Sequence, residues 1–272
     1  MLNKIDKIML GVLLALLVLS GGVHWRGETE LPVEPEIVAP EVVESVEEKP
    51  VVAIPDFSDI LDVKAKKSAF FGFLLPMVQE ENDTILQNRE RIVALSSQSV
   101  FSESSRTWLT DMARKYRIRD VATFDEAFFQ KLLTRVDTIP ASLALAQSAN
   151  ETAWGTSRFA RQGNNFFGQW CFSSGCGIVP GSRPEGEIYE VQKFEDVAAS
   201  VSAYMHNLNT NHQYRVLREL REQKRESQAP VTGADLAHGL QAYSIRGDEY
   251  VKELLSMINS NKLLQYDLGD QG

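Results

Sequence analysis

A single acidic residue interrupts the run AQSANETAWG, which covers residues 146–155. Glu151 follows small and apolar residues and precedes Trp154 and Gly155. A glycine after a helical segment predicts the helix end, so Glu151 would lie in the last turn. There the helix dipole, together with desolvation by apolar neighbours, would raise the pKa of the carboxyl group. A carboxyl group that keeps its proton near neutral pH can protonate the leaving oxygen of a glycosidic bond.

The segment that would position Glu151 is a helix within residues 137–155. Asp137 or Thr138 can cap its start, and Pro140 suits its first turn. The spacing of four residues places Gln147 and Glu151 on the same face. A simpler interpretation, which composition alone favours, is an exposed glutamate at a helix end.

Three short motifs favour a catalytic Glu151 over an exposed surface glutamate. They are ETAWG from Glu151, NNFFG at residues 164–168 and LQAY ending at Tyr243. Together they resemble the glucosaminidase family, glycoside hydrolase family 73, whose members cut bacterial cell-wall glycan. The resemblance covers about residues 137–260 and departs mildly from the family's ESxWG-like motif at Thr152 and Ala153. It implies a lysozyme-like helical fold with a catalytic glutamate at a helix end and a β-wing.

The resemblance also implies roles for single residues. Glu151 falls on the general acid of the family, and Tyr243 falls on a tyrosine beside the cleft. Asn165 and Phe167 belong to the NNFFG signature. We expect Gln147, Trp154, Asn165 and Phe167 to bind substrate, although aromatic residues at helical spacing are more often core residues.

A second carboxylate of this family often lies on the hairpin, where it orients water or stabilises the developing cation. Glu185, Glu187 and Glu190 are the candidates here. Glu190 is favoured because a strand fixes its direction, whereas Glu185 and Glu187 lie in or beside a turn. A mechanism with one carboxylate, assisted by the acetamido group of the substrate, remains the alternative.

The cysteine content is two, Cys171 and Cys176, in the sequence WCFSSGC. A close pair in an exported protein most often forms a disulfide. Free thiols or a catalytic cysteine are the alternatives. Because His206 and His212 show no metal-ligand spacing relative to the pair, we expect no metal site, and we expect no cofactor.

The remaining pattern predicts a mainly α (α+β) protein: a lysozyme-like helical domain with a small β-hairpin wing. Glycine-rich residues 163–194 interrupt the helical pattern and predict two strands, at 177–179 and 188–194. Pro76 would kink or start a helix. Other helices are expected at residues 66–96, 102–116, 124–136, 156–161, 195–208, 213–223, 233–243 and 248–258.

The N-terminal part looks different from the rest. Residues 1–26 contain Lys4 and Lys7 before the uncharged run 8–25, which predicts a signal anchor or a cleaved signal peptide. Residues 27–56 are rich in Pro and Glu and predict a disordered linker. A signal anchor would place the residues after it at the periplasmic face of the inner membrane, and a cleaved signal peptide would leave them free in the periplasm.

Two folded regions are expected after the linker. Residues 57–136 would form N-terminal helices that pack on a catalytic domain of residues 137–272. Residues 57–272 hold 27 acids and 24 bases, so their near-neutral balance does not favour nucleic-acid binding. The expected partners are peptidoglycan glycan strands and, through the N-terminal segment, the inner membrane; a protein partner in the envelope is left open. The leading hypothesis is cleavage of the β-1,4 bond after N-acetylglucosamine, and the alternatives are a lytic transglycosylase or a non-catalytic glycan-binding scaffold.

Overall fold

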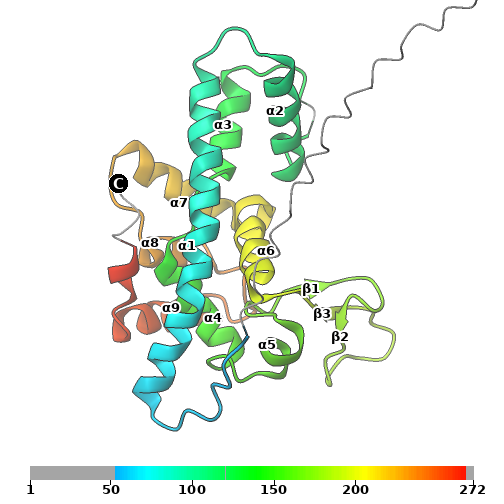
Figure 1. The fold of residues 1–272 in the computed structure, drawn as a ribbon, viewed down its shortest axis with the longest axis vertical. Coiled ribbons are helices and arrows are strands. Elements are labelled where there is room, and N and C mark those ends of the chain that lie inside the picture. The colour runs from blue at the N-terminus through cyan, green and yellow to red at the C-terminus, as the bar shows by residue number, and fades with distance from the viewer. Residues whose placement is uncertain (1–52, 120, 268–272) are drawn as a thin grey trace, which may run out of the picture. The chain divides into compact units, whose positions relative to one another are not determined.

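A computed structural model describes residues 53–119 and 121–267 (Figure 1). The predicted anchor and nearly all of the predicted linker lie outside these residues. Within the described residues, no helix combines the length and the apolar character needed to cross a bilayer. The prediction of a mainly helical protein with few strands is confirmed.

The helices follow the predicted segments, with end points that differ by a few residues in most cases. Their bounds are α1 (Val63–Ser96), α2 (Glu103–Lys115), α3 (Glu126–Arg135), α4 (Ala141–Thr152), α5 (Arg158–Gly163), α6 (Val197–Thr210), α7 (Arg215–Glu226), α8 (Gly233–Ala237) and α9 (Asp248–Ser260). Two 3-10 helices, η1 (His212–Tyr214) and η2 (Leu263–Tyr266), complete the helical part of the described chain.

Helix α1 is the longest helix described, with 34 residues and a length of about 51 Å at 1.5 Å per residue. It begins three residues before the predicted start, because Oδ1 of Asp62 accepts a hydrogen bond of 2.7 Å from the N–H of Ala65. Pro76 lies inside the helix and does not start it. Helix α1 contacts α3, α4 and α6, so it joins the N-terminal helices to the helix that carries Glu151.

The first described residues pack into the same core. Phe57 is 1% exposed and makes edge-to-face contacts with Phe70 and Phe73 of α1. Its ring also lies against Gly155, where an added Cβ would come within 2.4 Å of the ring. Gly155 has a φ of +78°, so both the backbone conformation and the space require glycine there. Phe57 therefore already belongs to the folded part of the chain.

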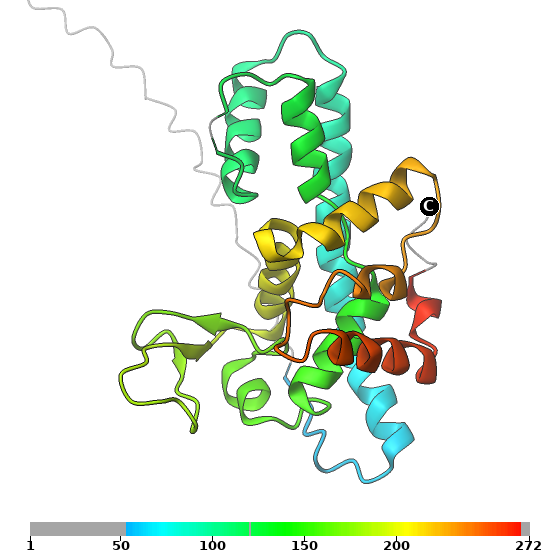
Figure 2. The same ribbon diagram turned by 180° about the vertical axis from the view of Figure 1, so that it is seen from behind.

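Helix α4 is the buried centre of the part that follows residue 136, and all of its residues from Ala141 to Ala149 are buried. It contacts α1, α8, α9 and η2, and Figure 2 shows the red α9 alongside the green α4. The predicted caps are wrong, because the N-cap position is Pro140, which makes no side-chain cap. Asp267 supplies the acceptor instead: its carboxylate takes hydrogen bonds from the N–H of Ser142 at 2.8 Å and from the Ser142 hydroxyl at 2.6 Å.

Asp137, one of the two predicted caps, lies in a cluster of arginines. Its side chain is 4% exposed and lies within 4 Å of guanidinium nitrogens of Arg89, Arg221 and Arg225. Burial by itself would raise the pKa of Asp137, but the three arginines lower it below its usual value. The carboxylate therefore joins α1 and α7 to the start of the α4 segment.

The prediction of one helix over residues 233–243 is wrong in its second half. Helix α8 ends at Ala237, and the chain continues in turns to Tyr243. A Cβ at Gly239 would lie 2.4 Å from the backbone of Leu217 in α7, so the chain passes α7 too closely for an ordinary helix side chain. This turn brings Tyr243 towards the residues after α5.

The predicted hairpin is a three-stranded antiparallel sheet. Strand β3 (Glu190–Gln192) lies between β1 (Trp170–Cys171) and β2 (Gly177–Ile178). The prediction missed β1 and made the other strands too long. Strands of two or three residues carry too little alternation to be recognised from the sequence. Figure 1 shows these strands extending as a wing beside α5 and α6.

Candidate active site

Glu151 lies one residue before the end of α4, as its sequence predicts. The three residues that follow Thr152 have left-handed backbone angles: Ala153 at φ +48°, Trp154 at +62° and Gly155 at +78°. Two non-glycine residues in this region store backbone strain, which is common beside functional sites. The hydroxyl of Thr152 holds the turn by accepting a hydrogen bond of 2.8 Å from the N–H of Gly155.

A chain of hydrogen bonds ends on the carboxyl group of Glu151. The hydroxyl of Tyr250, on α9, donates to Oε1 of Glu151 at 2.9 Å. Nε2 of Gln147 donates to the Tyr250 oxygen at 2.9 Å, and the Tyr204 hydroxyl donates to Oε1 of Gln147 at 2.6 Å. Gln147, Tyr204 and Tyr250 are at most 2% exposed, so this chain fixes the direction of Glu151 from within the core.

The half-buried Glu151 has a raised pKa. Desolvation is the largest cause, and the negative charge of Glu253 adds to it. The hydrogen bond from Tyr250 and the charge of Arg246 act in the opposite direction, because both favour the ionised form. The sequence-based expectation of a raised pKa, with desolvation as a cause, is therefore confirmed.

Glu151 opens into a cleft of about 500 Å³ between the wing, α6 and the turn before α9. Among the described residues that line it, Glu151 is the only carboxylate. Amide, aromatic and basic side chains form most of the remaining wall. The lining residues are Arg117, Glu151, Phe167, Gly168, Gln169, Trp170, Phe172, Gln192, Ala203, His206, Asn207, Asn211, Gln213, Tyr214, Ala242 and Tyr243.

Two of the predicted site residues, Phe167 and Tyr243, line this cleft and contact each other. The Tyr243 hydroxyl donates a hydrogen bond of 2.7 Å to the carbonyl oxygen of Phe167. The Phe167 ring stacks on Tyr204 at a centroid distance of 3.9 Å, and Tyr243 stacks on Tyr250 at 5.6 Å. The NNFFG motif and the LQAY motif are thus joined around the hydrogen-bond chain of Glu151. Gly168, the residue after Phe167, lies so close to Glu151 that an added Cβ would be 3.2 Å from Oε2 of Glu151.

Three other predicted substrate-binding residues lie outside the cleft lining. Gln147 is buried within the hydrogen-bond chain. Asn165 is 1% exposed and donates to the carbonyl oxygens of Gln169 and Gln192, so it ties the NNFFG turn to β3. Trp154 is partly buried and packs edge-on against Phe70 and Phe71 of α1, outside the cleft lining. These positions favour structural roles for all three.

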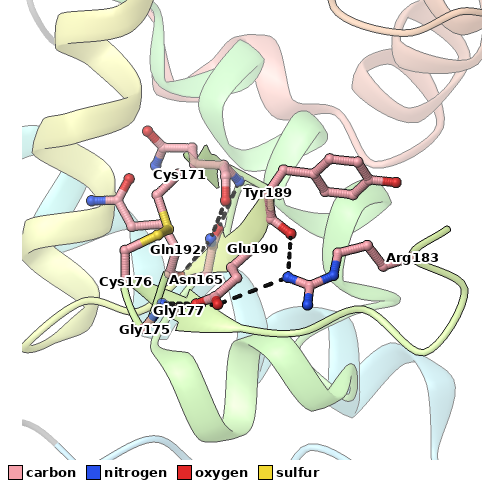
Figure 3. Close-up of a disulfide and its surroundings, with 10 residues drawn as sticks. Asn165, Cys171, Gly175, Cys176, Gly177, Arg183, Tyr189, Glu190 and Gln192 are labelled. Carbon is pink, nitrogen blue, oxygen red and sulfur yellow. Dashed lines mark hydrogen bonds and ion pairs between the residues drawn. A yellow bond between two sulfur atoms is a disulfide. The ribbon is translucent and has the colours of Figure 1, made fainter. Parts of the chain in front are cut away.

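Glu190 also lies outside the cleft lining, although it was the favoured second carboxylate. Figure 3 shows its side chain directed into the loop that follows the first cysteine. Its two carboxylate oxygens accept hydrogen bonds from the N–H groups of Gly175 at 3.0 Å and Gly177 at 2.8 Å, and Arg183 lies 3.9 Å away. These two hydrogen bonds lower the pKa of Glu190. The carboxylate holds the loop, and this geometry does not favour a role on substrate.

The alternative carboxylates, Glu185 and Glu187, are exposed in the long connection between β2 and β3. Neither lines the cleft. The acid of this site therefore has no second carboxylate opposite it among the described lining residues.

The predicted disulfide between Cys171 and Cys176 is present, with a Cα–Cα distance of 6.2 Å. It closes the same loop that Glu190 holds (Figure 3). The two sulfur atoms and a Glu190 oxygen lie within 4.8 Å of one another, a grouping that resembles a metal-ligand set. Disulfide sulfurs are not thiolate ligands, and Glu190 already accepts two N–H groups, so the chemistry of this set does not suit a metal ion.

Sequence reasoning missed several residues of the site. For Tyr250, the only sequence signal was the helical spacing of apolar residues in DEYVKELL, which indicates a core position. That spacing does not reveal the hydrogen bond to Glu151. Phe172 lines the cleft and is well exposed but was not singled out, whereas Trp170, also exposed, was one of the aromatic residues expected either to stack on sugar or to pack on the disulfide. Arg117 came from a region that carried no motif, and His206 was considered only as a possible partner of the cysteine pair.

Comparisons with known proteins agree with this geometry. The family described as Glucosaminidase, mannosyl-glycoprotein endo-beta-N-acetylglucosaminidase, matches residues 126–263. The chain belongs to this family. It is 32% identical over 212 residues to Protein bax of Escherichia coli strain K12, a match that covers 78% of this chain and 76% of that protein. No solved structure matches the chain significantly. Membership indicates a glycan hydrolase. The match begins at the first residue of α3 and includes the whole of α4, the buried helix that carries Glu151.

Proposed function

We propose that the protein is a peptidoglycan hydrolase that cleaves the β-1,4 bond after N-acetylglucosamine, with Glu151 as the general acid. One observation carries this proposal. A half-buried carboxyl group with a raised pKa opens into an aromatic and amide-lined cleft, and a buried tyrosine holds its other side. Protonation of the glycosidic oxygen by such a group lowers the barrier to bond cleavage.

The missing second carboxylate favours assistance by the substrate. In that mechanism, Glu151 donates its proton to the leaving oxygen while the acetamido oxygen of N-acetylglucosamine attacks the anomeric carbon. The glycosidic bond breaks and an oxazolinium ring forms. Water then opens this ring, and the ionised Glu151 accepts the proton from that water. Amide side chains of the cleft, such as Gln169 and Asn207, are suitable partners for the polar groups of the sugars.

The same single carboxylate also suits a lytic transglycosylase, in which a hydroxyl of the substrate attacks in place of water. We therefore keep this activity as the second candidate. A non-catalytic glycan-binding scaffold is the third candidate.

We place the enzyme in the envelope, anchored at the periplasmic face of the inner membrane or free in the periplasm after cleavage of the N-terminal segment. The apolar run of residues 8–25 after Lys4 and Lys7 supports export. The Cys171–Cys176 disulfide is consistent with an oxidising compartment. Peptidoglycan strands would be the substrate there, and fractionation of cells with and without residues 1–26 tests the placement.

The experiment compares wild type, Glu151→Gln and Glu195→Gln on purified peptidoglycan. Glu195 is an exposed glutamate outside the cleft lining, so it controls for a change of charge. We expect the release of reducing ends to fall by about 10²–10⁴-fold in Glu151→Gln only. Mass analysis of the products distinguishes the mechanisms, because only a transglycosylase leaves anhydro-muramic ends. Binding of wall by the wild-type protein without any cleavage would instead establish the scaffold.

A further inference from the structure

A group of cations lies at the end of α2, before the region that resembles the glucosaminidases. We call Arg114, Lys115, Arg117 and Arg119 the basic segment. These four cations fall within the six residues 114–119, which contain no acid. All four side chains are exposed. The rest of the chain after residue 56 carries more acids than bases, so this concentration of positive charge is local.

Arg117 connects the basic segment to the active site. It lines the cleft that contains Glu151 and also a second hollow of about 620 Å³. The second hollow is otherwise lined by Arg114, Arg119 and apolar or small residues of the same region. A glycan strand that leaves the cleft past Arg117 would therefore enter a hollow with further guanidinium groups.

The backbone of this region is held by helices outside it. Nη1 of Arg135, on α3, donates to the carbonyl oxygens of Tyr116 at 2.6 Å and Arg117 at 2.9 Å. Nε2 of His206, on α6, donates to the carbonyl oxygen of Lys115 at 2.6 Å. Arg117 itself has a φ of +56°, a backbone angle that few residues adopt without support. The position of the cations is thus built into the fold.

Among the residues that the structure describes, Arg117 has no acidic partner. Arg114 pairs with Asp111 at 2.9 Å, but Arg117 makes no ion pair with any described residue. Desolvation lowers the pKa of His206, and the charges of Arg117 and Lys115 lower it further. An exposed guanidinium group in a cationic surrounding favours an anionic ligand.

We propose that Arg117 and the basic segment form a subsite for the carboxylate-bearing peptides of the glycan strand. The inference rests on the proposed function, because peptidoglycan alternates a neutral sugar with one that carries a peptide with free carboxylates. Guanidinium groups bind carboxylates with two parallel hydrogen bonds, which a neutral oligosaccharide does not offer. The N-terminal helices would then select peptide-bearing strands over neutral polymers of N-acetylglucosamine.

The test uses Arg117→Asn, Arg117→Lys and the control Lys64→Ala in the full chain. Asparagine tolerates a positive φ, so the first variant removes the charge with little added strain. Lys64 is exposed at the start of α1 and lines neither hollow. Each variant is measured for KM and kcat on peptide-bearing peptidoglycan and on neutral N-acetylglucosamine oligomers, at about 0.05 M and about 0.3 M salt.

We expect Arg117→Asn to raise KM for peptide-bearing peptidoglycan by about two- to fivefold, the range for an exposed ion pair. The increase in KM should be larger for peptide-bearing peptidoglycan than for neutral oligomers, and the KM for peptide-bearing peptidoglycan should respond less to salt. Arg117→Lys, which keeps the positive charge, should retain most of the wild-type affinity for peptide-bearing peptidoglycan. An equal change on both substrates, or no change on either, would overturn the proposal.

A binding measurement separates this inference from the proposed function. Sedimentation with insoluble peptidoglycan and with chitin is carried out in the Glu151→Gln background, where turnover is not needed. Weaker binding of Arg117→Asn to peptidoglycan, with unchanged binding to chitin, would support the subsite even if the wild-type protein proved inactive. Unchanged binding to both polymers would refute it, whatever the activity.

Discussion

The hydroxyl of Tyr250 donates a hydrogen bond of 2.9 Å to Oε1 of Glu151, although the two residues are 99 positions apart in the chain. The bond leaves the other carboxylate oxygen beside Gly168 and the cleft. Tyr250 receives a hydrogen bond from Gln147 in turn, so its own orientation is set from the buried core. Tyr250 is thus a positioning residue for the proposed acid.

Replacement of Tyr250 by phenylalanine should shift the pH profile. The Tyr250 hydrogen bond lowers the pKa of Glu151, so its loss should raise that pKa and move the alkaline limb of kcat/KM to higher pH. Looser positioning should reduce kcat by about tenfold at the optimum. Tyr266→Phe, in η2, is the matched control. An unshifted alkaline limb, with normal folding by circular dichroism, would remove Tyr250 from this role.

The Glu151→Gln variant should be more stable than wild type at neutral pH. Burial raises the folded-state pKa of Glu151, so the ionised form costs free energy in the folded protein. This cost is absent below about pH 4, where the carboxyl group is protonated in both states, and it grows as pH rises through the folded pKa. The gain in Tm should therefore be largest near about pH 8 and vanish near about pH 4. A gain that does not depend on pH would contradict this origin.

Replacement of Asp137 by asparagine should destabilise the protein by about 3 kcal/mol, because it leaves the buried guanidinium of Arg221 beside a neutral partner. Asp111→Asn, which breaks the exposed pair with Arg114, should cost less than about 1 kcal/mol. Urea unfolding at neutral pH measures both. Because the arginines lower the pKa of Asp137, its contribution should disappear as pH falls through the folded pKa. Similar losses in the two variants would show that the arginine cluster does not act as a buried network.

Glu190→Gln should loosen the wing and spare the chemistry. The variant loses the ionised acceptor for the N–H groups of Gly175 and Gly177, so hydrogen exchange of these amides should become faster. Activity should fall by less than about tenfold, since Glu190 lies outside the cleft lining. Glu187→Gln, in the exposed connection, should change neither quantity. A loss as large as that of Glu151→Gln would instead restore Glu190 as a second catalytic carboxylate.

Much of this protein follows from local sequence. Helix periodicity and side-chain caps such as Asp62, Ser102 and Asp125 act within one turn, so the helices could be predicted to within a few residues. The short spacing between the two cysteines predicted the disulfide that the structure contains. Glu151 could be found because its motif and its place at a helix end lie within ten residues.

The surroundings of those residues depend on contacts between distant segments. Asp267 caps α4 from 125 residues away, and Tyr250 reaches Glu151 from 99 residues away, distances that no local pattern encodes. Trp154, Gln147 and Asn165 have the side chains of substrate-binding residues, but burial against α1, α9 and β3 gives them structural positions. The choice between cleft and core is made by packing, which removes a side chain from water only when the whole chain has folded. The sequence therefore determined which group could act as the acid, and the tertiary structure determined which groups surround it.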